Sequence, residues 1–430
     1  MGALKELYKD LRSVLAAPLR RKAFSPWVIN MVKRLVALSS HAFPWRATYL
    51  MTLKALDQVA KAYLHQRPVV WHNVFFPTEI LYGLKVIPFA PEAASALAVG
   101  LGLASEAFKM GSAHWVATDI CSFHRLATGL DLAGYFPAPD AIVCTSHLCD
   151  IAPQSLAWSS ARYSKPFYLL DVPQGSNPEN ASYVARQLKN IFYSLARDLG
   201  LSPDMEALRV AMERSNEARR LLLEIKAIRR QKPAVIRGEE AHGFLYLMLT
   251  SWGADFTKEV YQELLEELET RRRERKWAVP REKFRLLWLH LRPYYPTEIF
   301  KILEEEGGAI VVFEEMHHVY WEELDVDRPF YSLALKVLGH QGLGLMERRV
   351  RTILDMVQEF NAQGVIHFAH WGCRQSTAGI RLLQDALRQE NKAFLNLDGD
   401  CVDQEKYARG SVRTRLEAFL ELLAADRILP

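Results

Sequence analysis

Short apolar runs alternate with helical stretches twice along this chain, and this alternation limits the fold more than any other feature. Each run in the first series precedes a helical segment: 67–75, 85–89, 140–146 and 166–172. The second series has the same plan: 284–291, 309–316, 364–371 and 392–398. Strands that alternate with helices are typical of parallel sheets covered by helices on both faces. We therefore predict an α/β protein with two Rossmann-like, doubly wound parallel-sheet domains that face each other.

The rest of the chain is helix-periodic and completes a four-part division. Residues 1–64 carry apolar side chains at helix spacing and predict an N-terminal helical segment, beginning with an amphipathic helix. The region 204–280 is rich in Glu, Arg and Leu and predicts a helical connector packed on the first domain. The first α/β domain is then expected over 65–203 and the second over 281–430.

Bulk composition excludes several classes of protein. Five cysteines in 430 residues are not a disulfide framework, and no signal-peptide pattern opens the chain, so we expect a reduced, cytoplasmic compartment. No run of about 18 apolar residues predicts a membrane span. The net charge of +4 and the single basic run 271–276 do not indicate nucleic-acid binding. The sequence contains neither a GxxxxGK[ST] phosphate loop nor a GxGxxG after a strand, so ATP hydrolysis by that loop and dinucleotide binding are not expected.

Three cysteines, Cys121, Cys149 and Cys373, are candidate metal ligands. Each lies where a strand-like stretch meets a turn or a helix start, and the carboxyl ends of strands are where doubly wound sheets bind ligands. Three thiolates from separate loops suit a cubane iron–sulfur cluster with one iron open for chemistry. A structural zinc site would more often use closely spaced cysteine pairs, and the chain has no CxxC. The alternative is three inert, buried thiols. Cys144 and Cys401 are expected to be structural.

Two further residues are candidates for acid–base chemistry. His124 closely follows Cys121, and a histidine beside a cluster can tune it or transfer protons. Glu79 lies in the first turn of a predicted helix, where a carboxylate either stabilises the helix start or takes part in proton transfer.

Five motifs in order resemble those of the 2-hydroxyacyl-CoA dehydratase and benzoyl-CoA reductase family, which includes double-cubane cluster proteins. They are HNVFFPTEILYG at 72–83, CSFHRLATG at 121–129, HLCD at 147–150, HWGCRQSTAG at 370–379 and LDGDCVDQEKYARGSVRTRLEAFLE at 397–421. The resemblance extends from about residue 65 to the end of the chain.

This resemblance implies an iron–sulfur subunit of a lyase or reductase that holds a [4Fe–4S] cluster in the cleft between its two domains. Such subunits receive a low-potential electron from a separate ATP-hydrolysing iron–sulfur activator and pass it to an acyl-CoA thioester. The resemblance also implies a related subunit as heterodimer partner, or self-association as a homodimer, and an anaerobic setting. The turn that carries Glu79 is expected to face the cluster.

Two alternatives stay open from the sequence. One is an ATP-coupled reductase of small molecules with a double-cubane cluster, although five cysteines cannot supply six thiolates within one chain. The other is a non-catalytic subunit that relays electrons or acts as a scaffold.

Overall fold

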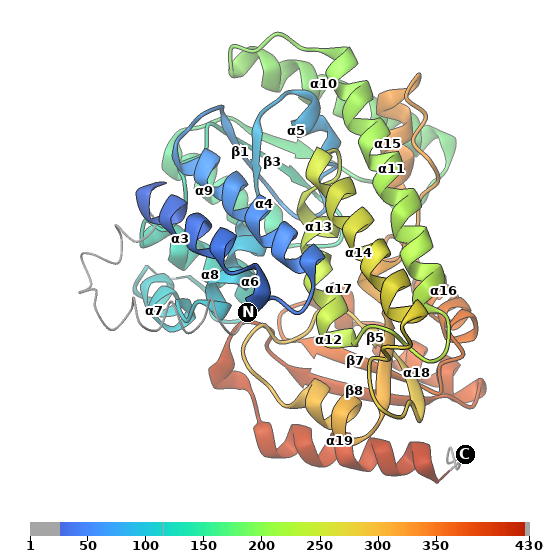
Figure 1. Cartoon of the computed structure of the whole chain (residues 1–430). Coiled ribbons are helices and arrows are strands. Elements are labelled where there is room, and N and C mark those ends of the chain that lie inside the picture. Colours follow the sequence, from blue (N-terminus) through green and yellow to red (C-terminus); the bar gives the residue numbers. More distant parts are fainter. Residues whose placement is uncertain (1–25, 115, 426–430) are drawn as a thin grey trace.

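The structure is a computed structural model, and it describes residues 26–114 and 116–425. Two four-stranded sheets, both entirely parallel, form the centres of two α/β halves (Figure 1). The predicted fold class is therefore confirmed. The amphipathic helix expected at the N-terminus falls within residues 1–25, outside the described part of the chain.

The first sheet has the strand order β2-β1-β3-β4. All four strands lie inside the predicted runs: β1 (Val69–His72), β2 (Ile87–Phe89), β3 (Ala141–Thr145) and β4 (Phe167–Leu170). Its helices are α5 (Glu79–Gly83), α6 (Pro91–Gly100), α7 (Ala104–Ala113), α8 (Ser122–Leu132), α9 (Ala152–Tyr163) and α10 (Pro178–Asp198). α6 and α7 are separate helices because Gly102 adopts a left-handed conformation (φ +75°) between them.

The second sheet repeats this topology in the order β6-β5-β7-β8. Its strands coincide with the predicted runs, apart from the last residue of β8: β5 (Phe284–Leu289), β6 (Ala309–Glu314), β7 (Gly364–His370) and β8 (Ala393–Gly399). The surrounding helical segments are η3 (Lys301–Glu306), η4 (Glu315–His317), α15 (Pro329–Leu338), α16 (Met346–Glu359), α17 (Arg374–Thr377), α18 (Ile380–Gln389), η5 (Gln404–Lys406) and α19 (Arg409–Ala424).

Helices outside the two sheets tie the halves together. N-terminal to β1 are α3 (Pro26–Leu38), η1 (Ser40–Ala42) and α4 (Arg46–Tyr63), and the predicted connector consists of α11 (Met205–Arg229), α12 (Gly238–Ala241), η2 (His242–Phe244), α13 (Leu245–Thr250) and α14 (Asp255–Arg273). α11 packs closely on α5, since a Cβ atom at Gly83 would lie 2.8 Å from the Cα of Leu208. α15, although it follows β6 in the chain, lies beside α10 of the first half (Figure 1).

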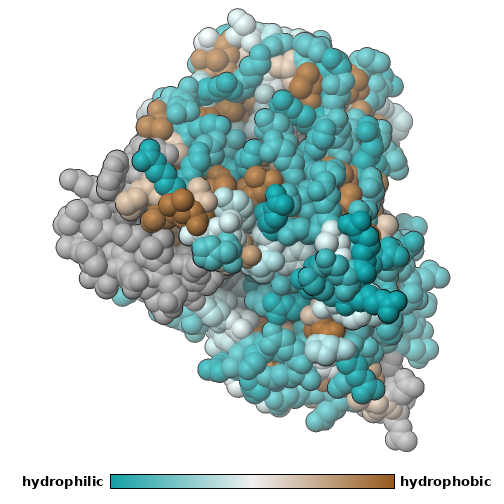
Figure 2. All heavy atoms as spheres, viewed as in Figure 1, coloured by the Kyte–Doolittle hydropathy of each residue, from teal (hydrophilic) through white to brown (hydrophobic). Residues whose placement is uncertain are grey.

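Buried apolar side chains cover both faces of each sheet. One core cluster combines α7 and α8 of the first half with strands of the second sheet, including Leu126, Leu130, Trp288 and Phe368. The helix that begins after Cys121 is therefore anchored to both halves. On the face shown in Figure 2, hydrophilic side chains predominate and hydrophobic ones form small separate patches. None of the helices in the described ranges is both long and apolar enough to cross a membrane.

Strand order identifies where a ligand site is expected in each half. The direction of chain winding reverses between β1 and β3 in the first sheet, and between β5 and β7 in the second. Open parallel sheets bind ligands outside the carboxyl ends of the strands at such reversal points. The segments that follow β1, β3, β5 and β7 all contribute to one cavity, so the two reversal points share a single site.

Candidate active site

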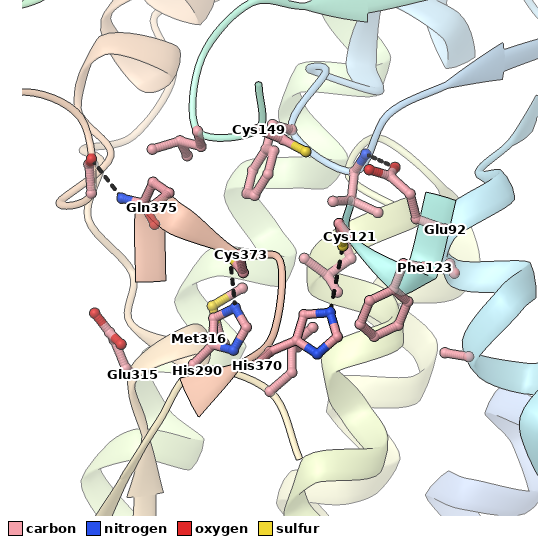
Figure 3. Close-up of a pocket in the computed structure, with 18 of the residues that line it drawn as sticks. Glu92, Cys121, Phe123, Cys149, His290, Glu315, Met316, His370, Cys373 and Gln375 are labelled. Atoms are coloured by element: carbon pink, nitrogen blue, oxygen red, sulfur yellow. Dashed lines mark hydrogen bonds between the residues drawn. The ribbon is translucent and has the colours of Figure 1, made fainter. Parts of the chain in front are cut away.

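A cavity of about 130 Å³ lies between the two halves, and Cys121, Cys149 and Cys373 all line it. Figure 3 shows the three cysteines on three separate segments around this space, together with His290 and His370. The structure thus brings together the three cysteines that the sequence singled out from positions up to 252 residues apart (373 − 121).

Different local structures position the three thiols. Cys149 follows β3, and Cys373 follows β7 and precedes α17, as the sequence predicted. Cys121 is the N-cap residue of α8, and the residues 116–120 before it form a loop. The expectation that a strand leads into Cys121 is therefore wrong. Its apolar neighbours belong to a loop because α7, not a strand, precedes them.

Each of the three cysteines has its own histidine. The Nε2 atom of His370 lies 3.5 Å from the sulfur of Cys121, that of His124 lies 3.5 Å from Cys149, and that of His290 lies 3.6 Å from Cys373. The backbone N–H of Cys401 donates to Nδ1 of His370 at 3.0 Å, so a neutral His370 carries its proton on Nε2, directed at Cys121. Nitrogen–hydrogen donors beside cysteine sulfurs are a known means of tuning iron–sulfur clusters.

Burial makes the thiols of Cys121 and Cys373 poor acids on their own. The pKa of Cys121 is well above its usual range, first because the thiol is buried and then because Cys149 and Cys373 lie near it. Burial likewise raises the pKa of Cys373 to about 11. A bound metal offsets the cost of ionising a buried thiol, because coordination stabilises the thiolate form. The donor set therefore suits a metal group.

The three cavity sulfur atoms are spread more widely than the ligands of a single ion. Among the described residues, one group of three potential ligand atoms lies within 4.8 Å of one another, and it consists of Glu92, His124 and Cys149. Cys121 and Cys373 line the same cavity but stand outside that group. Three thiols distributed more widely than one ion requires fit a polynuclear iron–sulfur cluster.

The environment of His124 differs from that of the other two histidines. Its Nε2 atom lies 3.1 Å from Oε1 of Glu92, and Oε2 of Glu92 accepts from the backbone N–H of Val74. Burial alone would lower the pKa of His124, but the contacts with Cys149 and Glu92 outweigh burial and raise this pKa to about 10. In contrast, burial lowers the pKa of His370 to about 4.

The sequence reasoning missed several cavity residues that follow strands of the second sheet. His290 follows β5, and Glu315 follows β6. Arg349, on α16, forms a buried two-pronged ion pair with Glu315, with nitrogen–oxygen distances of 2.7 and 2.8 Å. Their positions at the carboxyl ends of the predicted runs 284–291 and 309–316 were the available signal for His290 and Glu315. Arg349 had none, because its partner lies 34 residues away on another element.

The remaining candidates lie elsewhere. Cys144 is buried within β3 among apolar side chains, and Cys401 is buried in the core next to the second sheet. Glu79 is fully buried but is not one of the described residues that line the cavity. Its Oε1 accepts from Nζ of Lys336 at 2.6 Å and from the hydroxyl of Ser215 at 2.9 Å. The acid–base role predicted for Glu79 stays a prediction.

Two parallel-sheet halves thus meet at one cavity lined by three cysteines. A family model described as 2-hydroxyglutaryl-CoA dehydratase, D-component, matches residues 73–423. The chain therefore belongs to this family, as its motifs predicted. The lactoyl-CoA dehydratase subunit alpha of Anaerotignum propionicum is 18% identical to it over 408 residues, which cover 87% of this chain and 94% of the relative.

Proposed function

We propose that this chain is the cluster-binding subunit of a 2-hydroxyacyl-CoA dehydratase and holds a [4Fe–4S] cluster through Cys121, Cys149 and Cys373. The observation that supports this most is that three cysteines from two domains line one cavity, each with a histidine nitrogen 3.5–3.6 Å from its sulfur. When bound, such a cluster supplies one-electron transfer and one iron without a protein thiolate, where a thioester oxygen can bind.

The surrounding residues would prepare the cavity for that chemistry. His290 and His370 direct nitrogen atoms at the cysteine sulfurs, and apolar side chains such as Phe123, Leu291 and Met316 limit the access of water. His124, which contacts both Glu92 and Cys149, is the cavity residue placed to exchange a proton with a bound substrate.

The absence of a phosphate loop from the sequence and the likeness to a dehydratase subunit support a proposal about partner proteins. Because the sequence has no phosphate loop, we propose that a separate ATP-hydrolysing iron–sulfur activator delivers the electron. The relative is named as one subunit of a dehydratase, which supports assembly of this chain with a related subunit or with a second copy of itself. Reduced thiols in the cavity fit a cytoplasmic protein.

A double-cubane reductase is the second candidate, but the positions of the cysteines favour a single cubane. Three of the five cysteines line the cavity, while Cys144 and Cys401 are buried in apolar cores. We therefore expect roughly four irons per chain, since six thiolates would be required for two cubanes at three per cube. A chain that only relays electrons or acts as a scaffold would hold a cluster without turnover, or none.

Replacement of each cavity cysteine by serine tests the assignment. Cys121→Ser, Cys149→Ser and Cys373→Ser should each lower the iron and sulfide content of protein purified without oxygen, because a ligand is lost. Cys144→Ser is the matched control, since its thiol lies in β3 away from the cavity lining. Full iron content in all three cavity variants would overturn the proposal.

A further inference from the structure

Three neighbouring spaces share lining residues. An outer vestibule of about 410 Å³ shares Gly342, Arg349 and Gln375 with the cysteine-lined cavity. On its other side, the cavity shares Phe75, Met316 and His340 with an inner chamber of about 50 Å³. The vestibule and the chamber have no lining residue in common, so the cavity lies between them.

The inner chamber has mostly apolar walls and one buried ion pair. Its lining includes Trp252, Trp321 and Lys336, and the Lys336 ammonium lies 4.7 and 4.9 Å from the centres of the two indole rings. The same nitrogen lies 2.6 Å from Oε1 of Glu79, behind the chamber wall. The positive charge is therefore already balanced by a carboxylate and by two aromatic faces.

Two buried nitrogen atoms of chamber residues have no partner in the described part of the chain. They are Nδ1 of His147 and Nε1 of Trp321, in residues that are each about 5% exposed. An unpaired buried polar atom is costly and indicates that a water molecule or a ligand group belongs beside it. Both residues line the chamber.

The balanced charges of Glu79 and Lys336 restrict which groups can occupy the chamber. A carboxylate in the chamber would lose its hydration and meet Lys336 only in competition with Glu79. His340, also in the lining, is neutral at physiological pH because burial lowers its pKa to about 3. A neutral group carries no such cost. The volume of about 50 Å³ is also well below the roughly 150 Å³ of cavities that accept a benzene ring.

We propose that the inner chamber receives the side chain of the acyl group and selects 2-hydroxyacyl thioesters whose side chain is short and uncharged. This inference rests on the proposed function, because it places the thioester carbonyl in the cysteine-lined cavity and the remainder of the thioester in the vestibule. Glu79 then acts as a specificity-determining residue: it neutralises Lys336 and so excludes acyl groups that end in a carboxylate.

The test compares binding of two thioesters by titration calorimetry without oxygen. The cluster-loaded wild-type protein should bind 2-hydroxybutanoyl-CoA about tenfold or more tightly than 2-hydroxyglutaryl-CoA, because a buried carboxylate is left uncompensated. Glu79→Gln removes the balancing charge and should shift this preference toward the anionic thioester. The double variant Glu79→Gln, Lys336→Met removes both charges and should restore the preference for the neutral one.

Chamber filling gives a second measurement that does not depend on the buried pair. Val337→Phe places a larger side chain in the chamber lining and should weaken binding of the neutral thioester, whereas Leu335→Phe, exposed on the same helix, should not. Equal binding of both thioesters to wild type, with Val337→Phe also without effect, would overturn the inference and leave the proposed function intact. Failure of the cluster-loaded protein to bind any acyl-CoA would instead contradict the proposed function.

Discussion

A histidine nitrogen lies 3.5–3.6 Å from each of the three cavity sulfurs, and this pairing sets the electrostatics of the site at the scale of single residues. The three pairs are not equivalent. His370 is fixed by the backbone of Cys401, and His124 shares its nitrogen with Glu92. Nδ1 of His290 is buried without a hydrogen-bond partner among the described residues, and the His290 ring lies beside those of His367 and His370. His290 is therefore the residue at which the contact with sulfur can be removed with least disturbance.

We expect His290→Phe to lower the midpoint potential of the bound cluster. A hydrogen bond to a thiolate sulfur stabilises the more negative, reduced state, so its loss makes reduction harder. The measurement is a redox titration monitored by electron paramagnetic resonance, at equal iron content. His318→Phe is the matched control, because His318 is a largely buried histidine of the second half that does not line the cavity. An unchanged potential in His290→Phe would show that the contact is steric only.

At the scale of elements, the one-turn π-helix η3 carries a buried carboxylate that links it to β6 and α12. Oε1 of Glu304 accepts from the backbone N–H groups of Gly238, at 2.7 Å, and Val311, at 3.2 Å. Its Oε2 atom is buried without a partner in the described chain. Burial raises the pKa of Glu304 to about 8, and the two backbone donors only partly oppose this effect.

The raised pKa gives Glu304 a defined effect on stability. Between the ordinary pKa of 4.5 and about 8, the folded protein binds a proton that the unfolded chain has released, so this residue's contribution to stability falls as pH rises. Glu304→Gln keeps an oxygen acceptor but cannot ionise. The unfolding free energy of this variant, relative to wild type, should therefore increase by up to about 1.4 kcal/mol per pH unit between pH 6 and 8. The difference in melting temperature should change in the same direction.

Calorimetric melting at several pH values measures this difference. Glu305→Gln is the control, because Glu305 is an exposed neighbour paired with Arg237 and should show no such trend. A constant difference between Glu304→Gln and wild type across the range would mean that Glu304 ionises normally in the folded protein.

Elements were more predictable from the sequence than the contacts between them. Seven of the eight strands fall within the predicted runs and β8 extends one residue past its run, because parallel strands between two helical layers are rich in apolar residues. The stretch before Cys121 misled the prediction, because residues 116–120 form a largely exposed loop although they include apolar side chains. The Glu79–Lys336 pair could not be predicted, because it joins residues 257 positions apart through the packing of α15 on the first half.

At the scale of the whole molecule, the two halves meet both at the cavity and through a shared core. α7 and α8 pack against strands of the second sheet, while Cys149 and Cys373 approach each other from opposite halves. An exposed ion pair between Asp150 and Arg374 joins the same two loops and contributes little on its own. The shared core should therefore hold the halves together without the cluster, and the cluster should order mainly the loops around it.

Hydrogen exchange read by mass spectrometry, with and without the cluster, tests whether the shared core holds the halves together and the cluster orders only the loops. Loss of the cluster by chelation or by Cys373→Ser should increase exchange in the loops after β3 and β7 and at the start of α8, because ligand binding stabilises only the conformation that binds it. The strands of both sheets and the body of α8 should stay protected, since their apolar contacts do not involve the cysteines. Cys144→Ser, with its cluster retained, should exchange like wild type in those loops. Deprotection that spread through both sheets would mean that the cluster, and not the shared core, holds the two halves in place.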